Sequence, residues 1–227
     1  MKRNMMQRTT LREIRSTFGR FFAILSIIAL GVGFFAGVRI TTPSMVHAVN
    51  AFLQEKQFYD YRLISTLGWE QADVEAFQAM EDVRYAEGVN SLDVLCTDDE
   101  GTEFVLKTQT VPQQINQLML MEGRMPEQEN ECIMDAAMSS LHVGDVIRVS
   151  SANESDTLDA LCYQEFEIVG SAHTSYYLNF ERGTTSIGTG SAAGYLYVLP
   201  EAYDRDYFTE IFIRFDQDDM IYSQDYK

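Results

Sequence analysis

The longest apolar stretch of the chain runs from Phe21 to Val38, 18 residues without a charged side chain. At about 1.5 Å of rise per helical residue it is roughly 27 Å long, close to the roughly 30 Å hydrocarbon thickness of a bilayer. A secretory signal has a shorter apolar centre followed by small residues at a cleavage site, whereas Val38 is followed directly by Arg39. We interpret residues 21–38 as an uncleaved transmembrane helix; the alternatives are a cleaved signal and a buried core helix.

Beyond this stretch, alternating runs rich in aromatic and branched residues predict strands, and apolar residues at intervals of three and four predict helices. The predicted strands are 59–66, 83–89, 91–97, 103–110, 131–135, 145–150, 165–172, 195–199 and 208–215. The predicted helices are 44–57, which continues from the span, 68–81, 112–120 and 136–141, while 150–157 is a polar loop. The fold class is therefore α+β, with one N-terminal transmembrane helix followed by a mixed, mostly antiparallel extracytoplasmic domain.

Two of these strands form the clearest hairpin, because a turn composition at 98–101 separates them. The acidic residues of this turn lack the spacing of a calcium loop, so we interpret it as a solvated turn. The same interpretation applies to Asp216, Asp218 and Asp219, after the last strand.

Charge is distributed unevenly along the chain, whose formal net charge is −17. Residues 1–20 hold six of the 17 basic residues but one of the 34 acidic residues, Glu13. Basic residues near a span stay on the cytoplasmic side, which predicts a cytoplasmic N-terminus and an acidic domain outside. The residues that set this topology are Lys2, Arg3, Arg8, Arg12, Arg15 and Arg20. The acidic excess argues against nucleic acid as a partner, whereas the basic segment suits anionic lipid headgroups.

The basic segment is also amphipathic, with apolar residues at helical spacing. These are Leu11, Ile14, Phe18 and Phe21. They predict an interfacial helix before the span, and the alternative is a frayed basic tail. Within the span, Ala29, Gly33 and Gly37 lie on one helix face, which predicts close packing against another helix.

The sequence contains little evidence for a phosphate-binding, metal or catalytic site. Residues 183–194 have Walker-like glycine spacing without the phosphate-binding lysine, so we interpret them as a mobile glycine-rich loop. His47, His142 and His173 are far apart and fit no metal or catalytic motif. We expect no catalytic residue, cofactor or metal. The three cysteines, Cys96, Cys132 and Cys162, show no disulfide framework, and we expect buried free thiols.

Several stretches together resemble a known family. They are "LREIRSTFGRFFAILSIIALGVGFFAGV", "YDYRLIST", "MEGRMPEQENECIMD", "HVGDVIRV", "FEIVGSA" and "GTGSAAGYLYV". The chain resembles the FtsX-like, MacB-type permeases of ATP-binding cassette transporters over approximately residues 10–215. The matching part is the first span and the periplasmic core domain that follows it.

The resemblance implies a non-catalytic subunit in the bacterial cell membrane, with a cytoplasmic segment at 1–20, a span at 21–38 and a MacB-like core domain at 39–227. It implies a separate cytoplasmic ATPase as partner, together with the lipid bilayer and further permease spans or a second permease copy. ATP hydrolysis by the ATPase would move the extracytoplasmic domain, which acts on a peptide, lipid or lipoprotein partner. Because no second long apolar run follows, we expect an incomplete permease. The alternative is a free-standing membrane-anchored binding or sensing module.

By analogy with the family, the loop residues Gly123, Arg124 and Pro126 are expected to be structural. Gly123 and Pro126 bracket a turn. We expect Arg124 to pair with Glu122 or Glu131.

Overall fold

The computed structural model describes residues 9, 12–13, 17–179 and 181–216 of the chain. The chain divides into two compact units, Met1–Ala51 and Phe52–Lys227. The first unit is almost entirely helical where it is described, and the second contains all of the strands.

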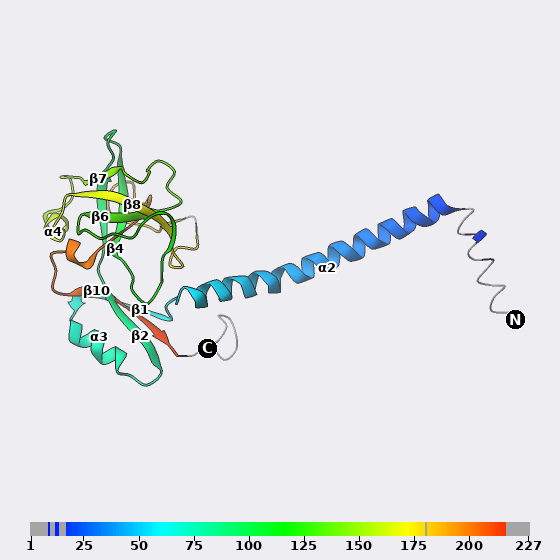
Figure 1. Ribbon diagram of the computed structural model, residues 1–227, viewed down its shortest axis with the longest axis horizontal. Helices are drawn as coiled ribbons and strands as arrows, with labels where there is room; N and C mark the ends of the chain where they lie inside the picture. Colours follow the sequence, from blue (N-terminus) through cyan, green and yellow to red (C-terminus); the bar gives the residue numbers. More distant parts are fainter. Residues whose placement is uncertain (1–8, 10–11, 14–16, 180, 217–227) are drawn as a thin grey trace. The chain divides into compact units, whose positions relative to one another are not determined.

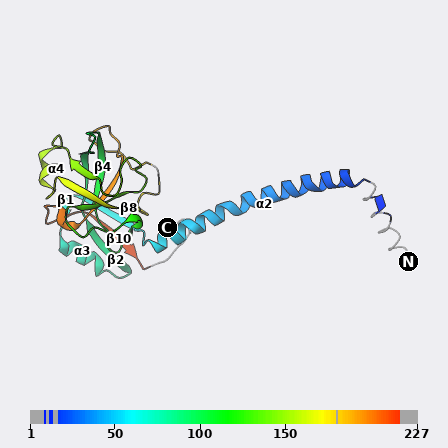
Figure 2. The same ribbon diagram turned by 45° about the horizontal axis from the view of Figure 1, so that its top comes forward.

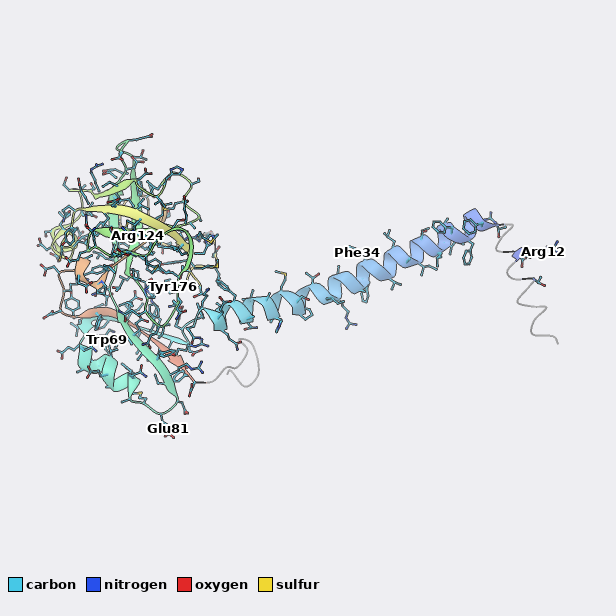
Figure 3. The ribbon with its side chains drawn as sticks, in the orientation of Figure 1. Arg12, Phe34, Trp69, Glu81, Arg124 and Tyr176 are labelled. Carbon is cyan, nitrogen blue, oxygen red and sulfur yellow. The ribbon has the colours of Figure 1, made fainter. Side chains whose placement is uncertain are left out.

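A single long helix, α2 (Phe18–Glu55), contains the apolar stretch. Its most apolar 18-residue window has a mean hydropathy of 2.5 and no buried residue, so length and composition allow it to cross a membrane. Among the described residues it is the one helix that meets this criterion. The helix passes through Pro43 without ending, as the predicted continuation at 44–57 requires. Figure 3 labels Phe34 on this exposed helix.

The second unit is a mixed domain of strands with short helices. Its strands are β1 (Tyr61–Trp69), β2 (Val83–Val89), β3 (Ser91–Thr97), β4 (Glu103–Thr110), β5 (Met119–Gly123), β6 (Glu131–Asp135), β7 (Val146–Val149), β8 (Glu165–His173), β9 (Gly194–Val198) and β10 (Phe208–Phe215). Its helices are α3 (Gln71–Gln78), α4 (Ser155–Asp159) and the 3₁₀ turn η1 (Pro200–Ala202). Every predicted strand is present, and the predicted α+β class is confirmed.

The smaller sheet is antiparallel, with the order β1-β10-β2, and α3 lies against it (Figure 1). Successive side chains of its central strand, β10, point alternately into two apolar clusters. Ile211 and Ile213 face the cluster that holds Val74 of α3. Phe212, on the opposite face, packs with Val89 and with Ile115 from a loop. Because side chains alternate between the two faces of a strand, β10 packs against α3 with one face and against the rest of the domain with the other.

The larger sheet has the order β5-β8-β6-β9-β4-β3-β7, and an additional pairing of β7 with β8 closes six of its strands into a barrel. β5 stays outside this ring, paired with the far half of β8. Most pairings are antiparallel, and β4–β9 and β6–β8 are the parallel ones among the described strands. The barrel is filled by an apolar cluster that includes Cys96, Cys132, Phe166 and Ile168. Figure 2 shows the barrel, with β4 and β8 labelled, in a second view.

Two predicted helices are wrong. Residues 112–118 form bends rather than a helix, and the last two residues of the predicted helix begin β5. The backbone N–H groups of this segment are bonded to groups distant in sequence, as described below. Residues 136–141 form turns, because the N–H groups of Ala137 and Met138 bond to the Asp135 side chain and carbonyl. The polar loop at 150–157 is wrong in part, because α4 begins within it.

The glycine-rich segment has defined local structure. Thr184 and Ser191 form an isolated antiparallel bridge, and Ala192 donates to the carbonyl of Gly183. Ala193 donates to the carbonyl of Val105 on β4, which ties the segment to the barrel. The predicted turn at 98–101 is confirmed, with the Asp98 carboxylate accepting from the N–H groups of Glu100 and Thr102.

Candidate functional site

The chain enters the domain through a short segment, residues 56–60, that is hydrogen-bonded to the loop 112–117. We call these two segments together the junction. Gln117 donates its backbone N–H to the carbonyl of Lys56 at 2.9 Å, and Asn116 donates to the carbonyl of Gln57 at 3.0 Å. Asn116 has a φ of 55°, a left-handed conformation that asparagine tolerates better than most residues. The carbonyls at the end of α2 thus receive partners from a loop nearly 60 residues away.

The Glu87 carboxylate on β2 holds the same loop from its other side. One oxygen accepts from the N–H of Gln113 at 2.7 Å, and the other accepts from Gln114 at 3.0 Å and Ile115 at 2.9 Å. Three consecutive donors therefore converge on one anion, a charge-assisted arrangement stronger than three neutral hydrogen bonds. Ile115 is consequently buried against Phe212 and Val89. This clamp fixes the start of the loop 112–117.

The junction is also joined to the central strand β10. Asp60 donates its N–H to the carbonyl of Ile213 and accepts from the N–H of Phe215, both at 2.8 Å. The guanidinium of Arg214 donates to the carbonyl of Phe58 at 2.6 Å. A displacement of residues 56–60 must therefore move β10, the loop 112–117, or both, or break several partly buried hydrogen bonds.

A partly buried ion pair lies next to the junction in the small sheet. Arg62 on β1 donates two hydrogen bonds of 2.6 Å to the carboxylate of Glu210 on β10. Burial alone would lower the pKa of Arg62, but the hydrogen bonds and the charge of Glu210, together with Tyr176 and Tyr177, outweigh it and raise that pKa, so the guanidinium stays charged. The guanidinium carbon also lies 5.5 Å from the centre of the Tyr176 ring, which follows β8 of the barrel.

Aromatic rings continue from this pair toward the barrel. We call Tyr59, Tyr176, Tyr177 and Tyr195 the aromatic ladder. The ring centres of Tyr59 and Tyr176 are 5.7 Å apart, those of Tyr176 and Tyr177 are 4.5 Å apart, and Tyr177 stacks on Tyr195 at 5.1 Å. Burial raises the pKa of the Tyr176 and Tyr177 hydroxyls, so the rings stay neutral. Figure 3 labels Tyr176 within the domain.

The ladder ends at a second buried ion pair. Arg182 donates to the carboxylate of Asp135 at the end of β6 and to the carbonyl of Asn179, and its guanidinium lies 5.6 Å from the Tyr195 ring centre. Both members of the pair are buried. Neighbouring rings at van der Waals contact transmit displacement because packed interiors compress little. Contacts within the domain are therefore continuous from the junction to β6.

The predicted loop residues Gly123, Arg124 and Pro126 lie together where β5 ends. Of the two expected partners of Arg124, the structure shows Glu131: the guanidinium donates to both carboxylate oxygens, at 2.7 Å and 2.5 Å. Glu131 is buried and also accepts from the N–H groups of Glu127 and Gln128. These bonds, with Arg124 contributing most, lower the pKa of Glu131 from 4.5 to about 2. The hydrogen bonds to the Glu131 carboxylate thus hold residues 124–130 in a loop around it.

Gly123 is required by geometry. Its φ is +77°, and a Cβ atom built on it would lie 2.2 Å from the carbonyl oxygen of Val169 on β8. It pairs with Gly170, where a Cβ atom would lie 2.5 Å from the carbonyl oxygen of Arg124. Two glycines therefore allow the end of β5 to cross β8 in close contact. Pro126 is buried.

The other predicted residues are placed as follows. Arg12 and Arg20 are exposed, whereas Lys2, Arg3, Arg8 and Arg15 lie outside the described residues, as do Leu11 and Ile14 of the predicted interfacial helix and Asp218 and Asp219. Ala29, Gly33 and Gly37 lie on α2, and a Cβ atom added at either glycine would meet nothing within 4 Å. That face is open for a neighbouring helix, so the packing role stays a prediction.

Within the described ranges, no group of three His, Cys, Asp or Glu side chains is placed to hold a metal ion. Cys96 and Cys132 are buried free thiols, as expected, but Cys162 is exposed, so that expectation is wrong for one of the three. Burial raises the pKa of Cys96 to about 12 and that of Cys132 well above its usual value. The reason is position: Cys96 and Cys132 alternate into the barrel, whereas Cys162 follows α4 on the surface.

Glu87, Arg62 and Glu210 were missed as candidate residues. The strand 208–215 did carry a signal, because Glu210 and Arg214 alternate with Ile211 and Ile213 on a strand that is central in the sheet. A charged side chain on a central strand needs a buried partner. Its partner could not be identified, since Arg62 is 148 residues away in sequence.

No family model matches the chain, and no curated protein matches it. Among solved structures, the extracellular domain of the noncanonic ABC-type transporter YknZ from Gram-positive bacteria aligns with a TM-score of 0.44 and 9% identity, covering 70% of this chain and 82% of that chain. The periplasmic region of MacB from Actinobacillus actinomycetemcomitans aligns with a TM-score of 0.39 and 9% identity, covering 69% and 68%.

A domain of a permease protein from Porphyromonas gingivalis aligns with a TM-score of 0.41 and 11% identity, covering 65% of this chain and 68% of that chain.

Proposed function

We propose that the chain is the N-terminal part of a permease subunit of an FtsX/MacB-type ABC transporter. Residues 21–38 anchor it in the bacterial cell membrane, residues 1–20 stay in the cytoplasm, and residues 39–227 form the extracytoplasmic domain. A separate cytoplasmic ATPase supplies the energy, and the domain acts on a peptide, lipid or lipoprotein partner. The subunit itself is non-catalytic.

One observation carries this proposal. An exposed helix with an uncharged stretch of membrane length, residues 21–38, is followed by an acidic domain whose first residues, 56–60, are hydrogen-bonded to β10 and to the loop 112–117. A simple tether needs no such attachment, because a flexible linker would serve. Attachment by several partly buried hydrogen bonds suits a domain that moves when its anchor moves. The sequence motifs quoted above support the same assignment.

The exposed thiol of Cys162 tests the orientation directly. In intact cells, a membrane-impermeant maleimide should label the full chain at Cys162, and a Cys162→Ser variant should not react. A matched variant that adds Thr9→Cys, at an exposed and uncharged residue of the N-terminal segment, to Cys162→Ser should react only after the membrane is permeabilised. If intact cells label the Thr9→Cys variant but not the wild-type chain, the topology is reversed and the proposal fails.

Coupling to an ATPase is tested by nucleotide dependence. In native membranes, hydrogen exchange of residues 56–60 and 112–117 should differ between ADP and ATP with vanadate, while exchange in the barrel strands should not. The full chain should also co-purify with a protein that carries a Walker motif. Equal exchange in both states, with no such partner, would favour the free-standing membrane-anchored module.

A further inference from the structure

The outer strand of the small sheet contains a large bulge. β1 pairs with β10, and its outer edge meets no other strand among the described residues. The pair Ile64–Glu210 is followed next by Trp69–Phe208, so residues 65–68 of β1 lie opposite Thr209 alone. Bulges of this kind redirect a side chain or terminate pairing.

The bulge is specified by the residues that form it. Gly68 has a φ of +85°, and a Cβ atom at this position would lie 2.4 Å from Cδ2 of Tyr207, so glycine lets that ring pack directly on the backbone. The Ser65 hydroxyl accepts from the N–H of Leu67 at 3.2 Å. As a result, Leu67 is 94% exposed and Ile64 is 63% exposed. Leu67 and Ile64 are therefore exposed apolar side chains on a strand edge whose unpaired backbone groups can pair with another chain.

An acidic hollow opens beside Leu67. Its volume is about 740 Å³, and it is lined by Leu67, Gly68, Glu70, Asp73, Asp206 and Tyr207. Three of these side chains are carboxylates, and no described basic residue lines the hollow. Arg205 lies just outside it, with its guanidinium 5.4 Å from the centre of the Tyr207 ring. The hollow therefore has the charge and the volume to receive a lysine or arginine side chain.

We propose that β1 and the acidic hollow form a docking surface for an extended, basic and apolar segment of a partner polypeptide. The segment adds to the free edge of β1, covers Leu67 and Ile64 with apolar side chains, and places a lysine or arginine in the hollow. Backbone hydrogen bonds would supply affinity, and the alternating side chains would supply specificity. This surface is separate from the junction and does not depend on the transport proposal.

Charge complementarity selects this occupant over a second copy of the chain. A second copy of the chain would present the same acidic hollow, with Glu70, Asp73 and Asp206, and like charges across an interface are unfavourable. The chain as a whole carries a net charge of −17, which adds to the repulsion. The same negative charge attracts a basic polypeptide.

The test uses the full chain in nanodiscs and a fluorescent peptide of alternating valine and lysine, with a valine–glutamate peptide for comparison. At about 50 mM salt, where exposed charges are weakly screened, the lysine peptide should bind and the glutamate peptide should not. Replacing Glu70→Gln together with Asp206→Asn should weaken binding by about 5- to 20-fold, because each exposed pair contributes modestly. Asp73 is left unchanged because it accepts from the Glu70 N–H at the start of α3.

A matched control, Glu100→Gln together with Glu201→Gln, removes the same charge elsewhere and should leave affinity within about 2-fold. Leu67→Ser should weaken binding by about 5-fold or more through lost apolar contact. A lysine peptide N-methylated at alternate residues should not bind, because it cannot donate to the strand edge. Unfolding followed by Trp69 fluorescence confirms that each variant is folded.

Two results would overturn the proposal. The first is equal binding by the hollow variant and the control variant, or by the two peptides. The second is a concentration-dependent dimer in sedimentation that Leu67→Ser dissociates, since this would make the occupant a second copy.

Discussion

Arg62 on β1 holds the carboxylate of Glu210 on β10 through two parallel hydrogen bonds of 2.6 Å. The Glu210 side chain is 5% exposed and that of Arg62 is 33% exposed, so the pair lies at the boundary between solvent and core. Its neighbours, Tyr176 and Phe212, belong to the barrel side and the small sheet respectively. The pair therefore fixes the position of the edge strand relative to the loop that follows β8.

Removing Arg62 should destabilise the domain strongly. Arg62→Ala leaves the buried Glu210 carboxylate without its cation, which should lower the free energy of unfolding by about 3 kcal/mol. Trp69 is the one tryptophan of the chain and lies on β1, so its fluorescence in urea reports on this sheet. Arg62→Lys keeps the charge but loses the paired donors. Its free energy of unfolding should therefore fall between those of the wild type and Arg62→Ala. Equal stability of Arg62→Ala and the wild type would contradict the assignment.

The acid response of the domain should depend on Arg124. Because the folded-state pKa of Glu131 is lowered to about 2, its ionised form stabilises the fold above about pH 4.5, and this contribution is lost as the pH falls toward 2. In Arg124→Ala the pKa returns toward its ordinary value. The stability difference between wild type and variant should be largest near pH 6 and should shrink below pH 4.5. Parallel curves over this range would show that Arg124 does not hold the carboxylate.

Glycine at position 123 should be far more sensitive than glycine at position 101. Both have positive φ, +77° and +79°, but a Cβ atom at Gly101 meets nothing within 4 Å. Gly101→Ala therefore measures the backbone cost alone, about 1 kcal/mol. Gly123→Ala adds a contact with the Val169 carbonyl and should cost about 3 kcal/mol or more. Similar losses at the two positions in urea unfolding would argue against the close crossing of β5 and β8.

The clamp of Glu87 on the loop 112–117 should be visible in hydrogen exchange. Glu87→Gln leaves one weaker acceptor for three donors, so amides of Gln113, Gln114 and Ile115 should exchange about 10- to 30-fold faster, which corresponds to about 1.5–2 kcal/mol. Exchange in β6, at the far end of the aromatic ladder, should be unchanged. Glu103→Gln, on the exposed start of β4, is the matched control. If the loop exchanges no faster in Glu87→Gln, the carboxylate is not what orders it.

Thiol reactivity should separate the three cysteines. Cys162 should react with Ellman's reagent in the native protein, whereas Cys96 and Cys132 should react only after unfolding. Burial and nearby Asp204 and Glu129 raise the pKa of Cys162, so its rate should keep increasing above pH 9. The substitution Cys162→Ser should abolish the native reaction. Native reaction of two or three thiols would contradict the burial of Cys96 and Cys132 in the barrel.

Local pattern was enough to predict most of the elements. Strands such as Val83–Val89 and Phe208–Phe215 alternate with a period of two, and the apolar run within Phe18–Glu55 is too long for a strand. The helices predicted at 112–120 and 136–141 are both wrong. In the first, Asn116 has a left-handed φ of 55°, and the N–H groups of Asn116 and Gln117, which a helix would bond within itself, donate to the carbonyls of Gln57 and Lys56. In the second, Asp135 closes a local turn with Ala137 and Met138.

Some contacts of the candidate site could be predicted from the sequence, and others could not. Arg124 and Glu131 are seven residues apart in a turn, so their pairing was within reach of the sequence. The Arg62–Glu210 pair, the Glu87 clamp and the aromatic ladder join segments separated by 18 to 148 residues. Nothing in the local pattern ranks one distant partner above another, because the chain carries 34 acidic residues.

The sequence by itself determined a membrane-length apolar helix, an acidic α+β domain and the positions of nearly all strands, since these depend on composition and on spacing along the chain. Only the tertiary structure decided that six strands close into a barrel, that the chain enters the domain through a hydrogen-bonded junction, and that Leu67 stands exposed beside an acidic hollow. Those features arise from pairings between residues far apart in the chain, whose energies exist only once the backbone has brought them together.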